Sequence, residues 1–459
     1  MNDQTTDLIP AALAVLLVMA ALTWVLPRRL AFCPLLFLTC IMPLGQQLVI
    51  AGLNFTIFRI VMLVGVVRVL ARGEAAQFRW TRLDKIFAWW VLVSVVFGTL
   101  SNPSISLFVN RTGDAYNAIC SYYFFRCVIV DFEDIVTGAR TLLLASLPLA
   151  VSMLYEGCTG INPFAAFGGV TLVDVLREGH IRCQGPFRNW ILAGTFGATL
   201  VPLCVALWYY RPQNRRLVVA GLMASVVVTV TARSSGPLMA LLAGAGVLMF
   251  WKWRRYLRLL RRGIIAAIIV LALVMKAPVW YLIAKLSSIT GGGGWHRAWL
   301  ISQAVDHFGQ WWLFGTTYTA NWSPAGEVIA ADPNMMDITN QYILEGVNGG
   351  VLKLALFLAI IFVCFRGIGR RLRAESPESP AAFFIWALGA TLFAHCLSFI
   401  SVTYFDQIVI IWYWLLAAIC LVIYSPPRSH AAVEVVAKSE EERDFSQIAG
   451  AFENGSPTS

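Results

Sequence analysis

The chain has 459 residues, of which 58% are hydrophobic and only 13% are charged, and its mean hydropathy is +0.71. A soluble globular protein carries about 25% charged residues, so this composition excludes a soluble enzyme of two or three ordinary domains. The formal net charge of +10 is typical of the basic cytoplasmic loops of a membrane protein and gives no reason to expect a nucleic-acid partner.

Apolar runs of about 20 residues, the length that a bilayer-spanning helix needs, recur along the chain. They predict an all-α polytopic membrane protein of twelve or thirteen transmembrane helices. In chain order the expected spans are 8–26, 31–51, 55–71, 86–106, 114–130, 141–157, 189–209, 217–233, 236–251, 263–285, 347–365, 381–401 and 407–424. The first span lacks the basic start and the cleavage site of a secretion signal. The fifth contains Tyr122, Tyr123 and Arg126, so it either crosses fully or is re-entrant or amphipathic.

Basic residues set the orientation of these spans. Clusters at 28–29, 72–85, 211–216, 252–262 and 366–373 follow the first, third, seventh, ninth and eleventh spans. If every span crosses, all five lie on one side, which is the cytoplasm by the positive-inside rule. The N-terminus is then outside and the C-terminus inside.

This orientation divides the chain into six segments. They are N-terminal membrane helices (1–157), a first outer loop (158–188), central membrane helices (189–285), a large outer loop (286–346), C-terminal membrane helices (347–424) and a polar cytoplasmic tail (425–459). The composition of the tail predicts disorder.

The first outer loop closes with the sequence IRCQGPF, in which Gly185–Pro186 predicts a break just before the seventh span. Arg182 and Arg188 flank this break. Cys158 and Cys183 lie in the same loop. On the oxidising side of a membrane these two cysteines either form a disulfide or stay unpaired.

Arg233 is a charge at the membrane edge, between the eighth and ninth spans, with no acidic residue near it in the sequence. A charge in such a position is by default a functional hypothesis. The turn that follows, Ser234–Pro237, offers hydroxyls, backbone N–H groups and a helix N-terminus, all of which attract anions.

The large outer loop begins with an amphipathic segment. From Trp295 to Trp312 apolar residues recur at helical spacing, and His296 and Arg297 stand at the start of this predicted helix. Its tryptophans are expected to pack or to lie at the lipid headgroups. His307 is expected to be an ordinary face residue.

The same loop ends in a polar stretch directly before a span, with Asp337, Asn340, Tyr342 and Glu345. A carboxylate at a partly dehydrated interface has a raised pKa. Such a group can act as a general base toward a hydroxyl. His395 lies inside a later span, and we expect a buried, hydrogen-bonded histidine there rather than a catalytic one.

Arginines on the outer side oppose the positive-inside rule and together indicate an anionic partner. A planar guanidinium suits phosphate oxygens well. The alternative is that each arginine pairs with a nearby carboxylate or extends to lipid headgroups. The arginines are Arg177, Arg182, Arg188, Arg233 and Arg297, and the available carboxylates are Asp174, Glu178, Glu327, Asp332, Asp337 and Glu345.

These segments, in this order, resemble the bacterial O-antigen ligase and O-antigen polymerase superfamily. Four motifs carry the resemblance over about residues 180–365. They are the R-x-x-G-P-F run at Arg182–Phe187, the arginine–serine–glycine turn at Arg233–Gly236, the arginine in a Trp-rich helix at Arg297–Leu300, and the closing stretch with Asn340, Tyr342 and Glu345–Gly349. The flanking spans are similar only in number and hydrophobicity.

The resemblance implies an integral inverting glycosyltransferase of the C-type membrane fold in the bacterial inner membrane. Such an enzyme takes a glycan from undecaprenyl pyrophosphate at the periplasmic face and passes it to a sugar hydroxyl, as polymerase or ligase in O-antigen or exopolysaccharide synthesis. It is expected to need no metal and no other cofactor. Arg182, Arg188, Arg233 and Arg297 would hold the pyrophosphate in place of a metal, and Asn340 and Tyr342 would support the loop and the acceptor.

One position departs from the family pattern. Ligases of this family usually carry a histidine directly before the asparagine of the closing motif, and here that position is Thr339. The base would then be Asp337, Glu345 or His296. The departure makes a polymerase or an exopolysaccharide enzyme more plausible than a ligase.

Two other functions fit outer arginines. One is a transporter or flippase of an anionic lipid-linked glycan, and the other is a non-catalytic membrane partner of a polysaccharide synthase. A transporter is typically built from two related halves with broken helices. The sequence shows no such halves, which favours the enzyme.

Overall fold

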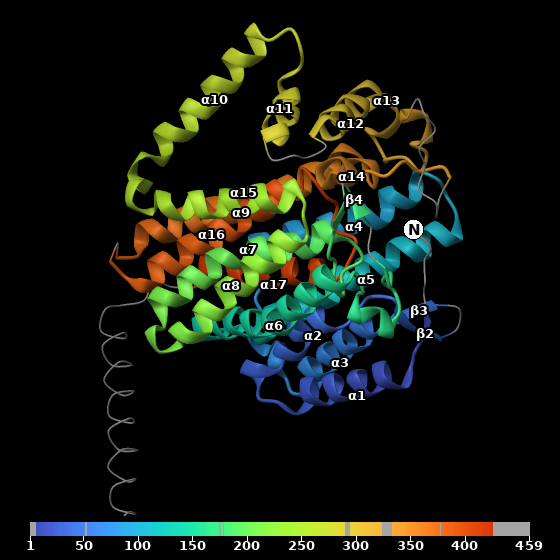
Figure 1. Ribbon diagram of the computed structural model, residues 1–459, viewed down its shortest axis with the longest axis vertical. Coiled ribbons are helices and arrows are strands. Elements are labelled where there is room, and N and C mark those ends of the chain that lie inside the picture. The colour runs from blue at the N-terminus through green and yellow to red at the C-terminus, as the bar shows by residue number, and fades with distance from the viewer. Residues whose placement is uncertain are drawn as a thin grey trace, which may run out of the picture.

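The computed structural model describes residues 6–50, 53–173, 176–177, 179–289, 294–323, 333–376 and 378–425. The tail after residue 425, for which we predict disorder, lies outside the described residues. The described chain is mostly helical (Figure 1). This architecture agrees with the all-α polytopic membrane protein that the composition predicts.

Within this described part, six helices are long and apolar enough to cross a membrane, or seven if one bent pair counts as a span. The six are α4 (Arg82–Leu100), α6 (Phe132–Thr159), α7 (Trp190–Tyr210), α8 (Arg215–Thr231) with the short helix before it, α15 (Gly350–Ala374) and α16 (Pro380–Ser398). Shorter or more polar helices at expected spans are α1 (Pro10–Val25), α3 (Ile57–Ala71), α5 (Ile105–Val128), α9 (Ser235–Met249), α10 (Leu257–Val274) and α17 (Ile408–Tyr424).

Two expected spans are wrong in their extent. The apolar run 31–51 gives only a short helix, α2 (Cys33–Ile41), because Pro43 and Gly45 follow its end and favour a turn. The chain then forms an antiparallel hairpin of β2 (Gln46–Ile50) and β3 (Leu53–Thr56), to which β1 (Thr6–Asp7) adds in parallel. The run 263–285 is broken before Pro278, where the helical stretch Ser235–Val274 and the following segment Val279–Lys285 differ in direction by 106°.

The fifth expected span is one continuous helix, α5, and it begins well before the predicted residue 114. Its polar residues are matched inside the bundle. Arg126 Nε donates to Asp84 Oδ1 of α4 at 2.9 Å, and the Tyr122 hydroxyl donates to the same oxygen at 2.7 Å. Because these groups satisfy one another, a helix with an arginine and two tyrosines packs among apolar neighbours.

The large outer loop folds on its own small core. It contains α11 (Leu282–Ile289), α12 (Gly294–Asp306), α13 (Phe308–Trp311) and α14 (Gln341–Val347). The predicted amphipathic helix is confirmed as α12 and α13. Leu300, Trp311, Trp322 and Ile338 form the buried cluster under these helices. The first outer loop has a short helix (Pro163–Phe167) and the two-stranded β4 (Leu176–Arg177) and β5 (His180–Ile181).

Helix α7 lies at the centre of the bundle and packs against α8, α9 and α16. Close approach needs small residues. A Cβ at Gly197 would lie 2.6 Å from the carbonyl oxygen of Ser225, and one at Gly194 would lie 2.8 Å from Ala232 Cβ. Small residues bring membrane helices into contact in this way. They hold the segments before α7 and after α8 against each other.

The two ends of the bundle differ in charge. At the basic end Arg28 pairs with Asp134 at 2.7 Å, and Arg211 pairs with Glu133 at 2.7 Å. Arg371 Nη1 donates there to the carbonyl of Ser425, where α15 and α17 finish. Residues of three of the five basic clusters, 28–29, 211–216 and 366–373, thus lie at this end. At the opposite end, here named the turn end, α6, α8 and α16 finish and α7, α9 and α17 begin.

Candidate functional site

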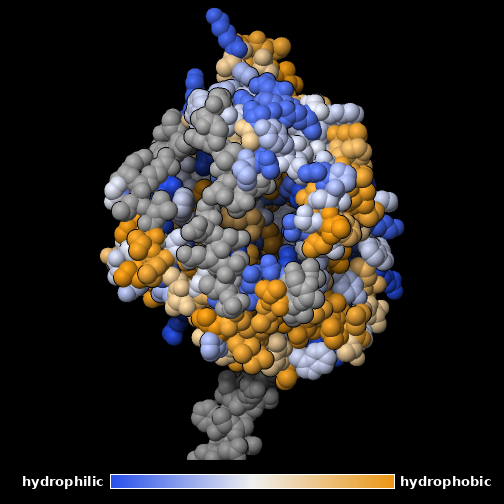
Figure 2. All heavy atoms as spheres, turned by 90° about the vertical axis from the view of Figure 1, so that its right-hand side faces the viewer, coloured by the Kyte–Doolittle hydropathy of each residue, from blue (hydrophilic) through white to orange (hydrophobic). Residues whose placement is uncertain are grey.

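The turn end brings together segments that are far apart in the sequence. Figure 2 looks at this end and shows a hollow near its centre, with hydrophilic residues around it. All four resemblance motifs lie around the loop between α16 and α17 (399–407). The Arg188 N–H donates to Asp406 Oδ2 at 2.7 Å, and the Gln341 N–H donates to the carbonyl of Phe399 at 2.8 Å.

The turn of the R-x-x-G-P-F motif is held by its backbone. The buried carboxylate of Glu156, at the end of α6, accepts the N–H groups of Gln184 (2.7 Å) and Gly185 (2.9 Å). Gln407 Nε2 donates to the carbonyl of Pro186 at 2.9 Å. Gly185 has a φ of 58°, a conformation that favours glycine. These contacts fix the backbone of the turn that Arg182 and Arg188 flank.

Arg182, which begins this motif, and Arg188, which directly follows it, have different surroundings. The Arg182 guanidinium carbon lies 5.2 Å from the centre of the Trp190 ring, a cation–π distance. Arg188 lines the cavity described below. Cys158 and Cys183 are not joined by a disulfide, so of the two alternatives for this loop the structure shows the unlinked one.

Arg233 adopts a strained backbone. Its φ is 43°, and no other non-glycine residue in the described ranges has a positive φ. Such a conformation costs a residue with a Cβ about 1–2 kcal/mol and is found where function requires it. The Arg233 side chain is exposed, and within the described chain it makes no hydrogen bond or ion pair. The charge is therefore open to a ligand at the membrane edge.

Arg297 reaches the same turn from the large outer loop. Its Nη1 donates to Ser235 Oγ, the first residue of α9, at 3.4 Å. A Cβ at Gly236 would lie 2.5 Å from Ser401 Oγ and 3.5 Å from Arg297 Nη2. Partial burial lowers the pKa of the Arg297 guanidinium. The second and third motifs, whose contacting residues are 62 positions apart in the sequence, thus meet beside the loop between α16 and α17.

Asp337 and His296 are within electrostatic reach of each other. The Asp337 side chain is exposed, but neighbouring protein atoms partly withdraw it from water and raise its pKa, while His296 opposes this effect. The His296 ring lies 5.5 Å from that of Trp299. A carboxylate with a raised pKa beside an imidazole is a plausible acid–base pair.

Asn340 and Tyr342 have positioning roles. Asn340 Oδ1 caps α14 by accepting the N–H groups of Tyr342 (3.0 Å) and Ile343 (3.2 Å). The Tyr342 hydroxyl donates to the carbonyl of Cys396 at 2.9 Å. Together they fasten α14 to the end of α16. Thr339, at the position of the usual histidine, is half-buried beside Asn340.

Glu345 is buried and fully engaged. Its carboxylate accepts from Trp90 Nε1 (2.9 Å) and Gln341 Nε2 (2.7 Å), and Lys353 Nζ lies 3.3 Å away. These three contacts fix the position of the carboxylate and occupy both of its oxygens. This geometry favours a structural role for Glu345 over that of a base.

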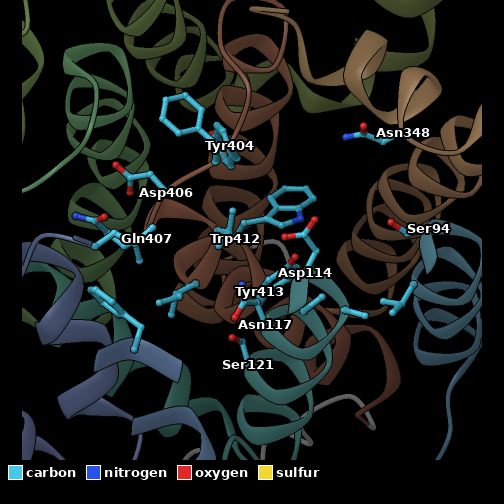
Figure 3. A pocket seen from close by; sticks show the side chains of 18 of the residues that line it. Ser94, Asp114, Asn117, Ser121, Asn348, Tyr404, Asp406, Gln407, Trp412 and Tyr413 are labelled. Carbon is cyan, nitrogen blue, oxygen red and sulfur yellow. The ribbon is translucent and has the colours of Figure 1, made fainter. Parts of the chain in front are cut away.

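A cavity of about 450 Å³ opens beside Glu345, among α3, α4, α5, α15, α17 and the loop between α16 and α17. Figure 3 shows side chains turned toward the same space from α5 (Asp114 and Asn117), from the turn between α14 and α15 (Asn348) and from that loop (Asp406). Its charged lining residues are Arg59, Arg111, Asp114, Arg188, Glu345, Lys353 and Asp406. Only Arg188 and Glu345 belong to the predicted site.

Asp406 is the most notable residue that the sequence argument missed. Its side chain is 2% exposed, and burial raises its pKa to about 7 although the Arg188 N–H and charge oppose the shift. Its position directly before the last span, as an acidic residue at a membrane edge, is the signal that points to it. Arg59, Arg111 and Asp114 are likewise charged residues near the ends of apolar segments. Arg59 lies in the first turn of α3, and the other two lie in the first half of α5.

The remaining predictions have mixed outcomes. His395 is buried, and its Nδ1 lies 2.6 Å from the Tyr404 hydroxyl, so the expected hydrogen-bonded histidine is confirmed. His307 stacks on Trp322 at 5.6 Å, as a packed face residue does. Asp174, Glu178, Glu327, Asp332 and the side chain of Arg177 lie outside the described residues.

Among the residues that the structure describes, no three His, Cys, Asp or Glu side chains are grouped as they would be to hold a metal ion. No protein-family model matches the chain, and no curated protein matches it. The functional assignment therefore depends on the geometry of the turn end and on the sequence resemblance.

Proposed function

We propose that this protein is a membrane glycosyltransferase that acts at the turn end of the bundle. It would take a glycan from undecaprenyl pyrophosphate and pass it to a sugar hydroxyl, as the polymerase or ligase of a surface polysaccharide. The turn end would face the periplasm of the bacterial inner membrane. The observation that carries the proposal is the open guanidinium of Arg233, with Arg297 bonded to Ser235 beside it.

Pyrophosphate is the chemistry that this arrangement suits. Arg233 stands two residues before the start of α9, and Arg297 bonds Ser235 in the first turn of that helix, so two arginines lie at one helix N-terminus. An arginine guanidinium can donate two parallel hydrogen bonds to two oxygens of one phosphate group, and a helix N-terminus adds a partial positive charge. Because these donors are fixed before the reaction, they stabilise the charge that develops on the leaving group. Arg182 and Arg188 flank the turn whose N–H groups bond the Glu156 carboxylate, and this turn also lies at the turn end.

The transfer would be one displacement. The acceptor oxygen forms a bond to the anomeric carbon while the bond from that carbon to the pyrophosphate oxygen breaks. Asp337 accepts the hydroxyl proton, and undecaprenyl pyrophosphate leaves as an anion among the arginines. A single displacement inverts the anomeric centre. Asp337 is preferred as base because its pKa is raised and His296 is near, whereas Glu345 is occupied by three donors.

The test is a glycan profile of the bacterium that carries this gene. A deletion strain is complemented with wild type, Arg233→Ala or Arg216→Ala at matched protein levels. Arg216 is an exposed arginine at the other end of α8, so its variant controls for loss of a charge. Lipid-linked and surface glycans are then measured by gel and mass spectrometry.

The proposal predicts that Arg233→Ala reproduces the deletion and Arg216→Ala the wild type. Accumulation of single lipid-linked repeat units would identify a polymerase, and long chains left on undecaprenyl pyrophosphate would identify a ligase. If the deletion strain has the glycans of wild type, the transfer function is wrong. If only the deletion differs, Arg233 is not part of the reaction.

A further inference from the structure

The cavity among α3, α4, α5, α15 and α17 is not used by the proposed donor site. Its volume of about 450 Å³ is within the range of about 300–1,000 Å³ that small-molecule sites have. Asp114 shows that the space is open, because its side chain is 66% exposed although the residue stands in the cavity lining (Figure 3). The cavity thus has room for one or more sugar rings.

The lining carries an excess of positive charge. Its described residues include four cations and three carboxylates, which leaves a net charge of +1 when all are ionised. Two pairs are close, since Lys353 Nζ lies 3.3 Å from Glu345 and Arg111 Nη1 lies 4.0 Å from Asp114. Cations therefore outnumber carboxylates around an anion that enters this space.

Arg59 hydrogen-bonds no carboxylate among the residues that the structure describes. Its Nε donates to Asn117 Oδ1 at 2.9 Å, and its Nη1 donates to the carbonyl of Asn54 at 2.6 Å. Neutral acceptors fix the guanidinium without cancelling its charge. Arg111 has donor capacity to spare as well. Its Nη2 donates to Asn348 at 2.9 Å, while its buried Nε has no hydrogen-bond partner in the described chain.

The other lining groups suit a polyhydroxylated ligand. Trp90 and Trp412 line the cavity, and Asn117, Asn348 and Gln407 supply amides. Aromatic faces pack against the C–H faces of sugar rings, and a few fixed polar groups then orient the hydroxyls. A sugar that bears an acid group would satisfy the charge and the polarity together.

One short loop separates the cavity from the donor site. Ser401 is in contact distance of the backbone at Gly236, beside Arg297, whereas Tyr404, Asp406 and Gln407 line the cavity. Arg188, on the pinned turn, also lines the cavity. A glycan bound in the cavity would therefore present its end close to the arginines of the donor site.

We propose that this cavity binds the acceptor glycan through an acidic sugar residue, whose carboxylate is held between Arg59 and Arg111. The inference rests on the proposed function, since it names the substrate class of the second substrate. It predicts a glycan with uronic acid or another acid-bearing sugar near the end that is extended.

The direct test is binding of two matched disaccharides to the full-length protein in nanodiscs, measured by saturation-transfer NMR titration. Cellobiouronic acid has a terminal glucuronic acid on glucose, and cellobiose is its neutral counterpart. Wild type should bind the acidic disaccharide about tenfold more tightly, the contribution of one charge-assisted hydrogen bond or more. Arg59→Gln and Arg111→Gln should each remove most of this preference.

A variant with the opposite effect separates the proposal from misfolding. Asp114→Asn removes a negative charge from the cavity and keeps the shape of the side chain, so it should tighten binding of the acidic disaccharide several-fold. A variant that merely disturbs the fold would weaken it. Arg216→Ala, far from the cavity at the basic end, should bind as wild type does.

Equal affinity for the two disaccharides, or no binding of either, overturns the proposal, as does weaker binding by Asp114→Asn. The glycan profile separates this result from failure of the transferase assignment. Arg233→Ala should stop transfer and retain disaccharide binding, because its side chain is absent from the cavity lining.

Discussion

The backbone of Arg233 offers a test that separates strain from function. Glycine adopts a φ near 43° without the Cβ clash, so Arg233→Gly should be about 1 kcal/mol more stable than Arg233→Ala. Both variants lack the guanidinium, and both should be inactive in glycan transfer. Thermal melting in detergent and the glycan profile check the two statements. An active Arg233→Gly protein would show that the turn matters and the charge does not.

Asp406 predicts a pH dependence of stability. Burial raises its folded-state pKa to about 7, above the unfolded value of about 4. The folded state therefore holds the proton longer, and the stabilisation is full below about pH 4 and is lost as the pH rises to about 7. Arg188 reduces the shift but does not reverse it.

The melting temperature of wild type should therefore fall more between about pH 5 and pH 8 than that of Asp406→Asn, which cannot titrate at this position. The measurement is a set of melting curves in one detergent at constant ionic strength. Parallel pH profiles of the two proteins would mean that Asp406 is ionised throughout.

Residue by residue, the sequence indicated the donor side of the site better than the cavity. Arg233 could be singled out because nothing acidic lies near it in the chain, and the structure leaves it open. Arg59 and Arg111 could not be singled out from the sequence. They are informative only because α3, α5 and the start of α15 lie together in space. That grouping depends on contacts between residues that are 58 and 237 positions apart in the sequence.

At the scale of elements, α5 shows how a polar helix is accommodated. Asp84 is 2% exposed and accepts from Arg126 and Tyr122. Arg126→Leu would leave a buried carboxylate without its counter-charge, at a cost of about 3–5 kcal/mol. The double variant Asp84→Asn, Arg126→Leu should recover part of that loss, since neither charge is then buried alone. Melting temperatures of the two variants check this.

If the double variant is no more stable than Arg126→Leu, the pair is not what holds α5 against α4. Asp84 also accepts a hydrogen bond from the Thr81 N–H at the start of α4, at 2.7 Å. Asn at position 84 can accept the same bond, so the double variant should keep this helix cap.

Hydropathy predicted most helices and failed where turn-forming residues interrupt an apolar run. The β2–β3 hairpin is so apolar that hydropathy assigns it to a membrane span. Only Pro43, Gly45 and the two glutamines that follow indicate that the helix ends before it. The break before Pro278 follows from its missing N–H. By contrast, the ends of α7, α8 and α16 lie within a few residues of the predicted ones.

At the scale of the whole molecule, the orientation in the membrane is open to a chemical test. Cys158 is exposed at the turn end. If that end faces the periplasm, a membrane-impermeant maleimide should label Cys158 in intact spheroplasts, and Cys158→Ser should remove the signal. In the Cys158→Ser background, Arg216→Cys at the basic end should be labelled only after the membrane is opened. The reverse pattern would place the turn end in the cytoplasm.

The bundle has a basic end with several ion pairs and a turn end to which separate segments contribute arginines. Whether those arginines bind a lipid pyrophosphate is measured most directly with purified protein in nanodiscs and undecaprenyl pyrophosphate, with undecaprenol as the uncharged lipid of equal length. We predict that wild type and Arg216→Ala bind the pyrophosphate and discriminate against undecaprenol, and that Arg233→Ala and Arg297→Ala each lose about tenfold or more in affinity. Equal binding of the two lipids by wild type, or unchanged affinity in Arg233→Ala, would contradict the assignment.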